Sequence, residues 1–324
     1  LLFAFVRIMA SIMDLTIDEI LSLEIAAGGG GGYADANNHP LNTLFLKLLA
    51  PYNSIFAYRL PSLLAGLALP LVPLVFRKAG KPGLWLFAAL GTCFYLVVHA
   101  SEARGYSLAA LFALLAYYLW SDGFRGSRAG LFPWIFALVC SLGALSHAIF
   151  YFAFGALVAT SFVVEPGVKR IVSAFGPAAA ALAAIFLLLY LQPIIIGSTM
   201  RDPWEVAVQA LALLAGLSGK AFWAQAAVAA LLLAPLFLSL LRHGPRKDPL
   251  ALVILLSLAS CFCAIYQGES LYYSSERYYL MSLLFYLVWA CEKLGRARGK
   301  IFPALVAAAF LAGNGWHILL FLAN

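Results

Sequence analysis

The chain has 324 residues, of which 64% are hydrophobic and 11% are charged. A water-soluble domain of this size could not bury so much apolar surface, so the composition excludes a soluble protein and indicates an integral membrane protein. The net charge of +7 comes from basic residues that gather in short loops between apolar runs, so it gives no reason to expect a nucleic-acid partner.

Apolar runs that are long enough to cross a hydrocarbon core of about 30 Å recur along the whole chain. They cover residues 60–76, 83–100, 105–120, 131–147, 148–164, 171–191, 222–241, 250–266, 278–292 and 301–322. Residues 1–13 resemble the end of one further span, so the sequence predicts about eleven transmembrane helices. The chain opens on Leu1, and we expect it to lack part of its natural N-terminus. The predicted fold is an all-α polytopic membrane protein with a single domain over residues 1–324.

The distribution of charge predicts which loops face the cytoplasm. When the loops are assigned alternately to the two sides, one side receives 14 of the 21 basic residues: Arg77, Lys78, Lys81, Arg125, Arg128, Lys169, Arg170, Arg242, Arg246, Lys247, Lys293, Arg296, Arg298 and Lys300. The positive-inside rule assigns that side to the cytoplasm. The other side receives 10 of the 14 acidic residues, which the rule does not explain: Asp14, Asp18, Glu19, Glu24, Asp35, Glu102, Asp202, Glu205, Glu269 and Glu276.

Residues 14–59 form the first extracytoplasmic segment, which is the longest polar part of the chain. Its first helix is predicted at TIDEILSLEIA, where Thr16 and Glu19 have the spacing of a capping box. Asp18 and Glu19 therefore have a purely structural interpretation, because acidic side chains stabilise the N-terminus of a helix.

A run of glycines at residues 28–32 separates this helix from the stretch ADANNHPLNTLFLKLL. Pro40 suits the first position of a helix, with Asn38 or His39 as its cap. Apolar residues then recur at helical spacing, with Asn42 and Lys47 on the opposite side: Leu41, Leu44, Phe45, Leu48 and Leu49. This pattern predicts an amphipathic helix in the membrane interface.

Other charged residues lie at the outer ends of predicted spans. HASEARGYSL contains Glu102 and Arg104, for which an ion pair that anchors a helix turn is the simplest interpretation. YQGESLYYSSERYYL contains five tyrosines, which an aromatic belt at the membrane surface explains, and Arg277, which such a belt does not explain. The simplest interpretation of Arg277 is an ion pair with Glu276. Arg59 is expected at the lipid boundary.

Four segments, in this order, resemble the GT-C membrane glycosyltransferases, and most closely the branch of protein mannosyltransferases and aminoarabinose transferases. The segments are TIDE, NNHPLN before the interfacial helix, YRLPSLLAGLALPL and SEARGYSLAALFALLAYYLW. Members of that branch carry an Asp-Glu pair early in the first outer loop, then a His-Pro-Pro-Leu or Lys-Pro-Pro-Leu motif. A Gln-Glu-Ala-Arg-like element and a late Arg-Tyr pair follow. The resemblance covers residues 15–120 and, more weakly, 270–290. This chain has His39-Pro40-Leu41 at the second motif, so no particular sugar is inferred.

The resemblance implies a GT-C-like bundle in the inner (cell) membrane of a bacterium, with interfacial helices in the first extracytoplasmic loop. Such an enzyme transfers a sugar from a polyprenyl-phosphate donor to an acceptor hydroxyl at the extracytoplasmic face. The acceptor, a lipid, a polysaccharide or a protein, stays open. Residues 14–59 would be the catalytic loop of this enzyme.

The resemblance also implies roles for single residues. Asp18 would be the general base of an inverting displacement. Arg277 and Arg104 would hold the donor phosphate, because a guanidinium binds phosphate through paired hydrogen bonds. The candidate catalytic residues as a set are Asp18, Glu19, Asp35, His39 and Glu102. The sequence requires no cofactor; a divalent metal ion is conceivable among Asp18, Asp35, His39 and Glu102, but no ligand spacing demands one.

Two other classes of protein are alternatives. A secondary transporter would need charged residues near the middle of the bilayer and broken helices in related halves, whereas these spans are nearly free of charge. A non-catalytic lipid-binding membrane protein would tolerate a conservative change such as Asp18→Asn.

Overall fold

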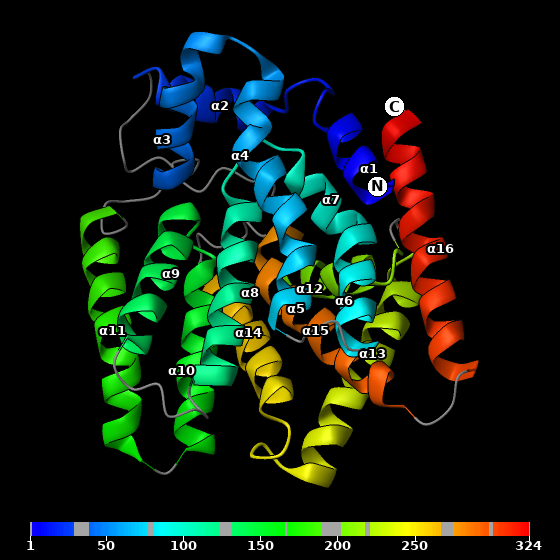
Figure 1. The fold of residues 1–324 in the computed structure, drawn as a ribbon. Coiled ribbons are helices and arrows are strands. Elements are labelled where there is room, and N and C mark those ends of the chain that lie inside the picture. Colours follow the sequence, from blue (N-terminus) through cyan, green and yellow to red (C-terminus); the bar gives the residue numbers. More distant parts are fainter. Residues whose placement is uncertain are drawn as a thin grey trace. The chain divides into compact units, whose positions relative to one another are not determined.

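The computed structural model describes residues 2–28, 39–76, 81–123, 131–165, 167–189, 202–217, 221–266, 275–297 and 301–323. Its regular elements are α-helices and short 3-10 helices, and no strand occurs in these ranges (Figure 1). The predicted all-α class is therefore confirmed for this part of the chain.

The chain divides into two compact units, which are described separately. The first comprises Leu1–Leu69 and Val98–Gly197, and contains α1 (Leu2–Ala10), α2 (Ile17–Ala26), α3 (Pro40–Leu49), η2 (Ala50–Tyr52), α4 (Ile55–Ala68), α8 (Tyr106–Gly123), α9 (Phe132–Ser146), α10 (Phe150–Val164) and α11 (Val168–Leu189). The second comprises Pro70–Val97 and Ser198–Asn324, and contains α5 (Val72–Phe76), α6 (Lys81–Thr92), α12 (Pro203–Leu214), α13 (Phe222–His243), α14 (Pro249–Tyr266), η4 (Glu276–Tyr279), α15 (Leu280–Arg296) and α16 (Ile301–Ala323). The short helices η3 (Leu69–Leu71) and α7 (Phe94–Ala100) each include a boundary between the units.

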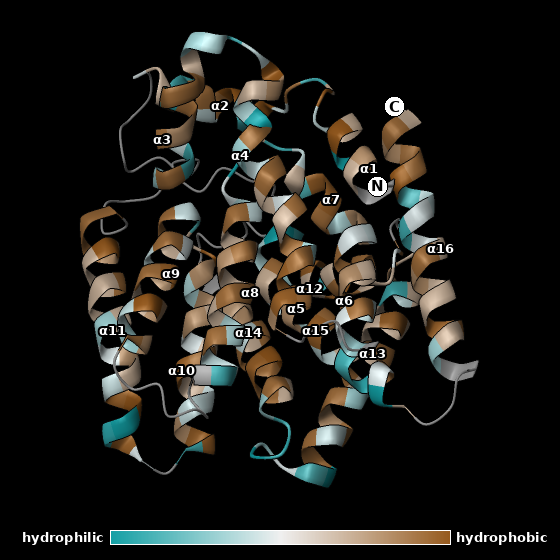
Figure 2. Ribbon diagram, viewed as in Figure 1, coloured by the Kyte–Doolittle hydropathy of each residue, from teal (hydrophilic) through white to brown (hydrophobic). Residues whose placement is uncertain are grey.

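Where the structure describes them, the ten predicted apolar runs consist mainly of helix, and Figure 2 shows how apolar these helices are. Among the described residues, four helical stretches are long and apolar enough to cross a membrane: Ile55–Phe76, Val168–Leu189, Phe222–His243 and Pro303–Ala323. A bent pair, Pro82–Thr92 with Phe94–Ala100, makes a fifth if it is counted as one span. A helical membrane protein is thus supported, whereas eleven crossings stay a prediction.

Large apolar side chains on the outward faces of the long helices agree with a lipid environment. Leu188 of α11 is 76% exposed, Trp223 of α13 is 83% exposed and Leu319 of α16 is 65% exposed. Inside the first unit, α8 packs against α4, α9 and α10 through alanines that are fully buried, namely Ala109, Ala110, Ala113 and Ala116. Small side chains let membrane helices approach closely, which agrees with the contacts of α8 with its three neighbours.

The run at 83–100 was expected as one span, but the structure divides it at Cys93 into two helices that are bent by 60°. The physical reason lies in the second unit, where the backbone N–H of Phe94 donates a hydrogen bond to Asn314 Oδ1 at 2.8 Å. Asn314 is completely buried in α16. A side-chain acceptor that replaces a helical carbonyl is a recognised cause of a kink.

The two helices of the first outer segment form as predicted. Thr16 and Glu19 make the capping box of α2, with the Glu19 N–H donating to Thr16 Oγ1 at 3.3 Å and the Thr16 N–H donating to Glu19 Oε2 at 2.8 Å. Pro40 is the first residue of α3, and His39 occupies the cap position without a capping hydrogen bond from its side chain.

The apolar faces of α2 and α3 point away from the first unit. Leu44 and Leu48 of α3 are 51% and 63% exposed, whereas Asn42 is buried. In α2, Ile17 is 77% exposed and Glu19 is buried. Each helix therefore exposes several apolar side chains, as a helix that lies in a membrane interface would, although Ile25 and Leu46 are buried and Glu24 and Lys47 are exposed.

Candidate functional site

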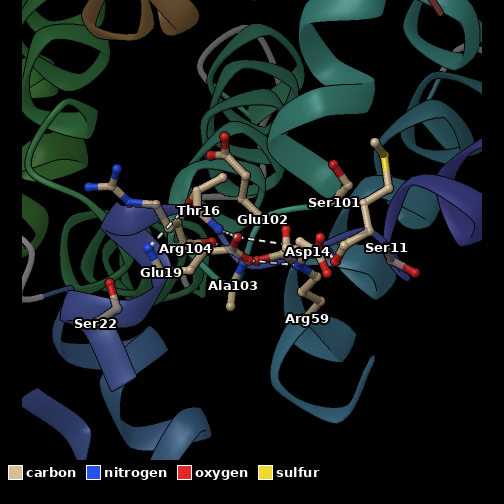
Figure 3. A network of polar contacts seen from close by, with 12 residues as sticks. Ser11, Asp14, Thr16, Glu19, Ser22, Arg59, Ser101, Glu102, Ala103 and Arg104 are labelled. Atoms are coloured by element: carbon tan, nitrogen blue, oxygen red, sulfur yellow. Dashed lines mark hydrogen bonds and ion pairs between the residues drawn. The ribbon is translucent and has the colours of Figure 1, made fainter. Parts of the chain in front are cut away.

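Glu19 lies at the centre of a buried polar network in the first unit (Figure 3). It forms an ion pair with Arg59 of α4, in which Arg59 Nε is 2.7 Å from Oε1 and Nη2 is 2.7 Å from Oε2. The Ala103 N–H also donates to Oε1 at 2.6 Å, and the Thr16 N–H donates to Oε2. Each carboxylate oxygen thus accepts two hydrogen bonds, and the side chain is fully buried. A carboxylate with its acceptor positions filled is suited to anchoring the backbone and unsuited to receiving a proton.

Arg59 completes this network. Its Nη1 donates to the carbonyl of Met13 at 2.6 Å, and its Nη2 donates to the carbonyl of Asp14 at 2.8 Å. The sequence placed Arg59 at the lipid boundary but did not predict that its side chain, which is 2% exposed, pairs with Glu19. A charge inside an apolar protein is tolerated when an opposite charge and further hydrogen bonds satisfy it.

Asp18, the neighbour of Glu19, has a different environment. Its carboxylate forms an ion pair with Arg104, whose Nη1 donates to Asp18 Oδ2. The Asp18 side chain is 30% exposed, whereas that of Arg104 is 4% exposed. The pair therefore presents its carboxylate, and not its guanidinium, to the surroundings.

The segment that joins α7 to α8 carries Arg104 and is fixed by its backbone. Asn42 of α3 donates from Nδ2 to the carbonyl of Ala103 at 2.9 Å. Gly105 packs so closely on the end of α9 that a Cβ there would lie 1.8 Å from the carbonyl oxygen of Ser146. Only glycine fits this approach, so the position of Arg104 depends on packing as well as on charge.

A cluster of imidazole and phenol rings lies beside Arg104. The rings of His39 and His147 are stacked with their centres 4.2 Å apart, and Tyr106 lies 4.2 Å from His147 and 4.8 Å from His99. Arg104 lies over Tyr106 at 5.0 Å, and its Nη2 is 3.3 Å from His39 Nε2. All four rings are buried. The cluster thus joins α3, α7, α8 and α9 around one guanidinium.

Glu102 points to a different partner from the one that the sequence suggested. Its Oε2 is 3.3 Å from His99 Nδ1, and Arg104 pairs with Asp18. Glu102 and Arg104 therefore each have an ion-pair partner that the sequence did not suggest.

Most of the predicted catalytic residues come together in the first unit. Asp18, Glu19, His39, Glu102 and Arg104 contact one another directly or through one shared partner. Asp35, the remaining catalytic candidate, lies outside the described residues.

Four residues of this site were not predicted from the sequence: Arg59, the partner of Glu19, and the ring-bearing residues His99, Tyr106 and His147. An ionisable residue near a span end that pairs with another is a known signal of function, and it would have singled out Arg59 and His147.

The described part of the structure gives little support to a divalent metal ion at this site. Among the described residues, no group of three or more His, Cys, Asp or Glu is arranged to hold a metal ion. Asp35, one of the four candidate ligands, is outside that search.

Arg277, the candidate phosphate ligand, belongs to the second unit. It lies in η4 at the start of α15, and its Nε donates to Ser275 Oγ at 3.0 Å. Its role stays a prediction.

Comparison with known proteins gives no relative: no family model, no curated protein and no solved structure matches this chain. The geometry of the site is therefore the main ground for a function.

Proposed function

We propose that this protein is a membrane glycosyltransferase that moves a sugar from a polyprenyl-phosphate donor to an acceptor hydroxyl at the extracytoplasmic face. One observation carries the proposal. In a network where Glu19 is buried with both oxygens occupied, Asp18 keeps a partly exposed carboxylate that a guanidinium orients. A proton acceptor that is positioned and accessible is what attack by a hydroxyl group requires.

The proposed chemistry balances without a redox partner or cofactor. The acceptor oxygen forms a bond to the anomeric carbon while the bond from that carbon to the phosphate oxygen breaks, which inverts the configuration. Asp18 takes the proton of the acceptor hydroxyl, and polyprenyl phosphate leaves with the electron pair of the broken bond. The leaving group needs stabilisation of its charge more than protonation.

The other residues of the site have supporting roles in this proposal. Arg104 holds Asp18 in place through their ion pair, and its side chain is 4% exposed. Arg277, in the second unit, stays a candidate for the donor phosphate on the ground of its sequence alone, since its planar fork matches phosphate oxygens. The outward apolar faces of α2 and α3 support a location of this loop at the bilayer surface.

The test is to incubate the purified protein in lipid with a panel of polyprenyl-phosphate sugars and to measure released polyprenyl phosphate. We expect release from one member of the panel, and loss of that release in Asp18→Asn. Glu24→Gln is the matched control, because Glu24 is an exposed carboxylate on the same helix. Equal release by Asp18→Asn and the parent protein would contradict the proposed role of Asp18.

A secondary transporter is the second candidate, and the bent pair α6 and α7 favours it. Transporters bind substrate at discontinuous helices, and this pair is bent by 60°. Uptake of radiolabelled sugars or amino acids by proteoliposomes, with no release of polyprenyl phosphate, would support this class. A lipid-binding protein without activity would show neither result.

A further inference from the structure

We infer that His147 is a positioning residue of the candidate site. It holds His39 as a neutral hydrogen-bond acceptor for Arg104, and so fixes the guanidinium beside Asp18. The kinetic consequence rests on the proposed function, whereas the protonation states can be measured without any activity.

The hydrogen bonds of the two rings define where their protons lie. A guanidinium can only donate, so His39 Nε2, which is 3.3 Å from Arg104 Nη2, is an acceptor and the ring carries its proton on Nδ1. The backbone N–H of Ile149 donates to His147 Nδ1 at 3.1 Å, so that ring carries its proton on Nε2. Both rings are therefore neutral, and they are opposite tautomers.

The stack limits the orientation of His39. The two ring planes are 25° from parallel, and their centres are 4.2 Å apart. His147 is itself fixed, because it caps the C-terminal end of α9 and packs against Tyr106 on α8. A side chain with a fixed ring on one face and a guanidinium at one nitrogen has one low-energy arrangement.

Arg104 depends on this arrangement. Its Nη1 donates to Asp18 and its Nη2 contacts His39, so the two acceptors together set the plane of the guanidinium. If His39 turns, Nη2 loses this acceptor and the guanidinium is held less firmly beside Asp18. A displacement of about 1 Å in a catalytic group can lower a rate by roughly 10²-fold.

The first arm of the test is nitrogen NMR of the ¹⁵N-histidine-labelled protein, which distinguishes the two neutral tautomers and the charged ring. The chain has five histidines, so few signals need assignment. We expect the signal of His39 to be that of an Nδ1–H tautomer and to disappear in His39→Phe. The signal of His147 should be that of an Nε2–H tautomer and should disappear in His147→Phe. In His147→Gln, whose amide oxygen can still accept from Ile149, His39 should lose its single tautomer; His147→Phe keeps a stacked ring and should preserve it.

The second arm measures turnover with the polyprenyl-phosphate sugar that the parent protein accepts. His147→Gln should lower kcat by about tenfold or more with KM for the donor little changed, and His147→Phe should restore most of it. His243→Gln, on the exposed end of α13, is the control and should match the parent protein.

The two arms separate the inference from the function on which it rests. An unchanged His39 tautomer in His147→Gln overturns the inference, whatever the activity. If the parent protein turns over no donor but the tautomers behave as stated, the proposed function fails and the positioning role of His147 stands.

Discussion

Asp18 and Glu19 are adjacent in sequence, yet their surroundings assign them different tasks. Glu19 accepts four hydrogen bonds from Arg59, Ala103 and Thr16, and it is fully buried. Asp18 forms an ion pair with Arg104, and 30% of its side chain is exposed. The two carboxylates can therefore be separated by conservative substitutions.

Asp18→Asn should lower kcat by about 10²–10⁴-fold with donor affinity little changed, because the amide keeps the shape but cannot take a proton. Thermal unfolding of the purified variant should change less than that of Glu19→Gln, because Asp18 is partly exposed, although the buried Arg104 loses its opposite charge. Steady-state release of polyprenyl phosphate together with a melting curve measures both quantities.

Glu19→Gln should act on stability instead. Whichever way the amide is turned, its NH₂ group would face donors, namely Arg59 with either Ala103 or Thr16. Breaking a buried ion pair in this way costs about 3–5 kcal/mol, so we expect a large fall in melting temperature and in the yield of folded protein. A stable but inactive Glu19→Gln, beside an active Asp18→Asn, would transfer the role of base to Glu19.

At the residue scale, sequence predicted what local rules determine. The capping box of Thr16 and Glu19 and the start of α3 at Pro40 depend on residues within one turn, and both are confirmed. The partners of Glu19 and Asp18 lie 40 and 86 residues away, at Arg59 and Arg104. Such partners depend on packing between helices, which no local pattern encodes.

At the scale of elements, apolar periodicity located the helices but not their breaks. The run 83–100 is divided at Cys93, where the Phe94 N–H donates a hydrogen bond to the side chain of Asn314. These two residues are 220 positions apart in the sequence. The prediction for α3 holds for Asn42, which is buried while Leu44 and Leu48 are exposed, but not for Lys47, which is exposed with them. The inward orientation of Asn42 on α3 is stabilised by its hydrogen bond to the carbonyl of Ala103.

A second buried carboxylate joins three helices of the second unit. Asp248 lies between α13 and α14 and is 5% exposed. Lys293 of α15 forms an ion pair with it at 2.7 Å, Trp289 donates from Nε1 at 3.0 Å, and Ser239 of α13 donates from its hydroxyl. Burial opposes ionisation of this carboxyl, but the hydrogen bonds from Lys293, Ser239 and Trp289 and the charge of Lys293 outweigh it and lower the pKa of Asp248.

This lowered pKa predicts the direction of a pH dependence. A carboxyl whose pKa is lower in the folded state than in the unfolded state contributes stability above its unfolded pKa of about 3.9, and that stability is lost as the pH falls through the folded pKa. At neutral pH, Asp248→Asn should lower the free energy of unfolding by about 1–3 kcal/mol, the value of hydrogen bonds to a charged group.

Chemical denaturation of the detergent-solubilised protein at neutral pH and at acidic pH measures this effect. Glu292→Gln is the control, because Glu292 pairs with Arg296, which is 67% exposed, and surface pairs contribute little. If Asp248→Asn is as stable as the control at neutral pH, the hydrogen bonds and ion pair of the Asp248 carboxylate do not contribute to the free energy of unfolding.

At the scale of the whole molecule, composition alone predicted the class, and the charged loops predicted its orientation. Four apolar helical stretches, or five with the bent pair, are long enough to cross a membrane, and their outward faces carry exposed leucine and tryptophan side chains. The number of crossings could not be read in the same way, because several apolar helices are shorter than a span: Phe132–Ser146, Phe150–Val164, Pro203–Leu214 and Pro249–Cys263. Length and hydropathy cannot decide whether such a helix crosses.

The orientation is the prediction on which the proposed function depends most, because a polyprenyl-phosphate sugar must meet the site on one particular side. Ala27, at the end of α2, is exposed on the segment assigned to the outside, and Lys247 is exposed in a basic loop assigned to the cytoplasm.

Among the native cysteines, Cys263 is exposed and the other four are buried, so Cys263→Ser gives a background of low reactivity. On that background, Ala27→Cys should react with a membrane-impermeant maleimide in intact cells, and Lys247→Cys should react only after permeabilisation, because basic loops are retained in the cytoplasm. Labelling of Lys247→Cys in intact cells would reverse the orientation, place Asp18 on the cytoplasmic side and remove the proposed extracytoplasmic reaction.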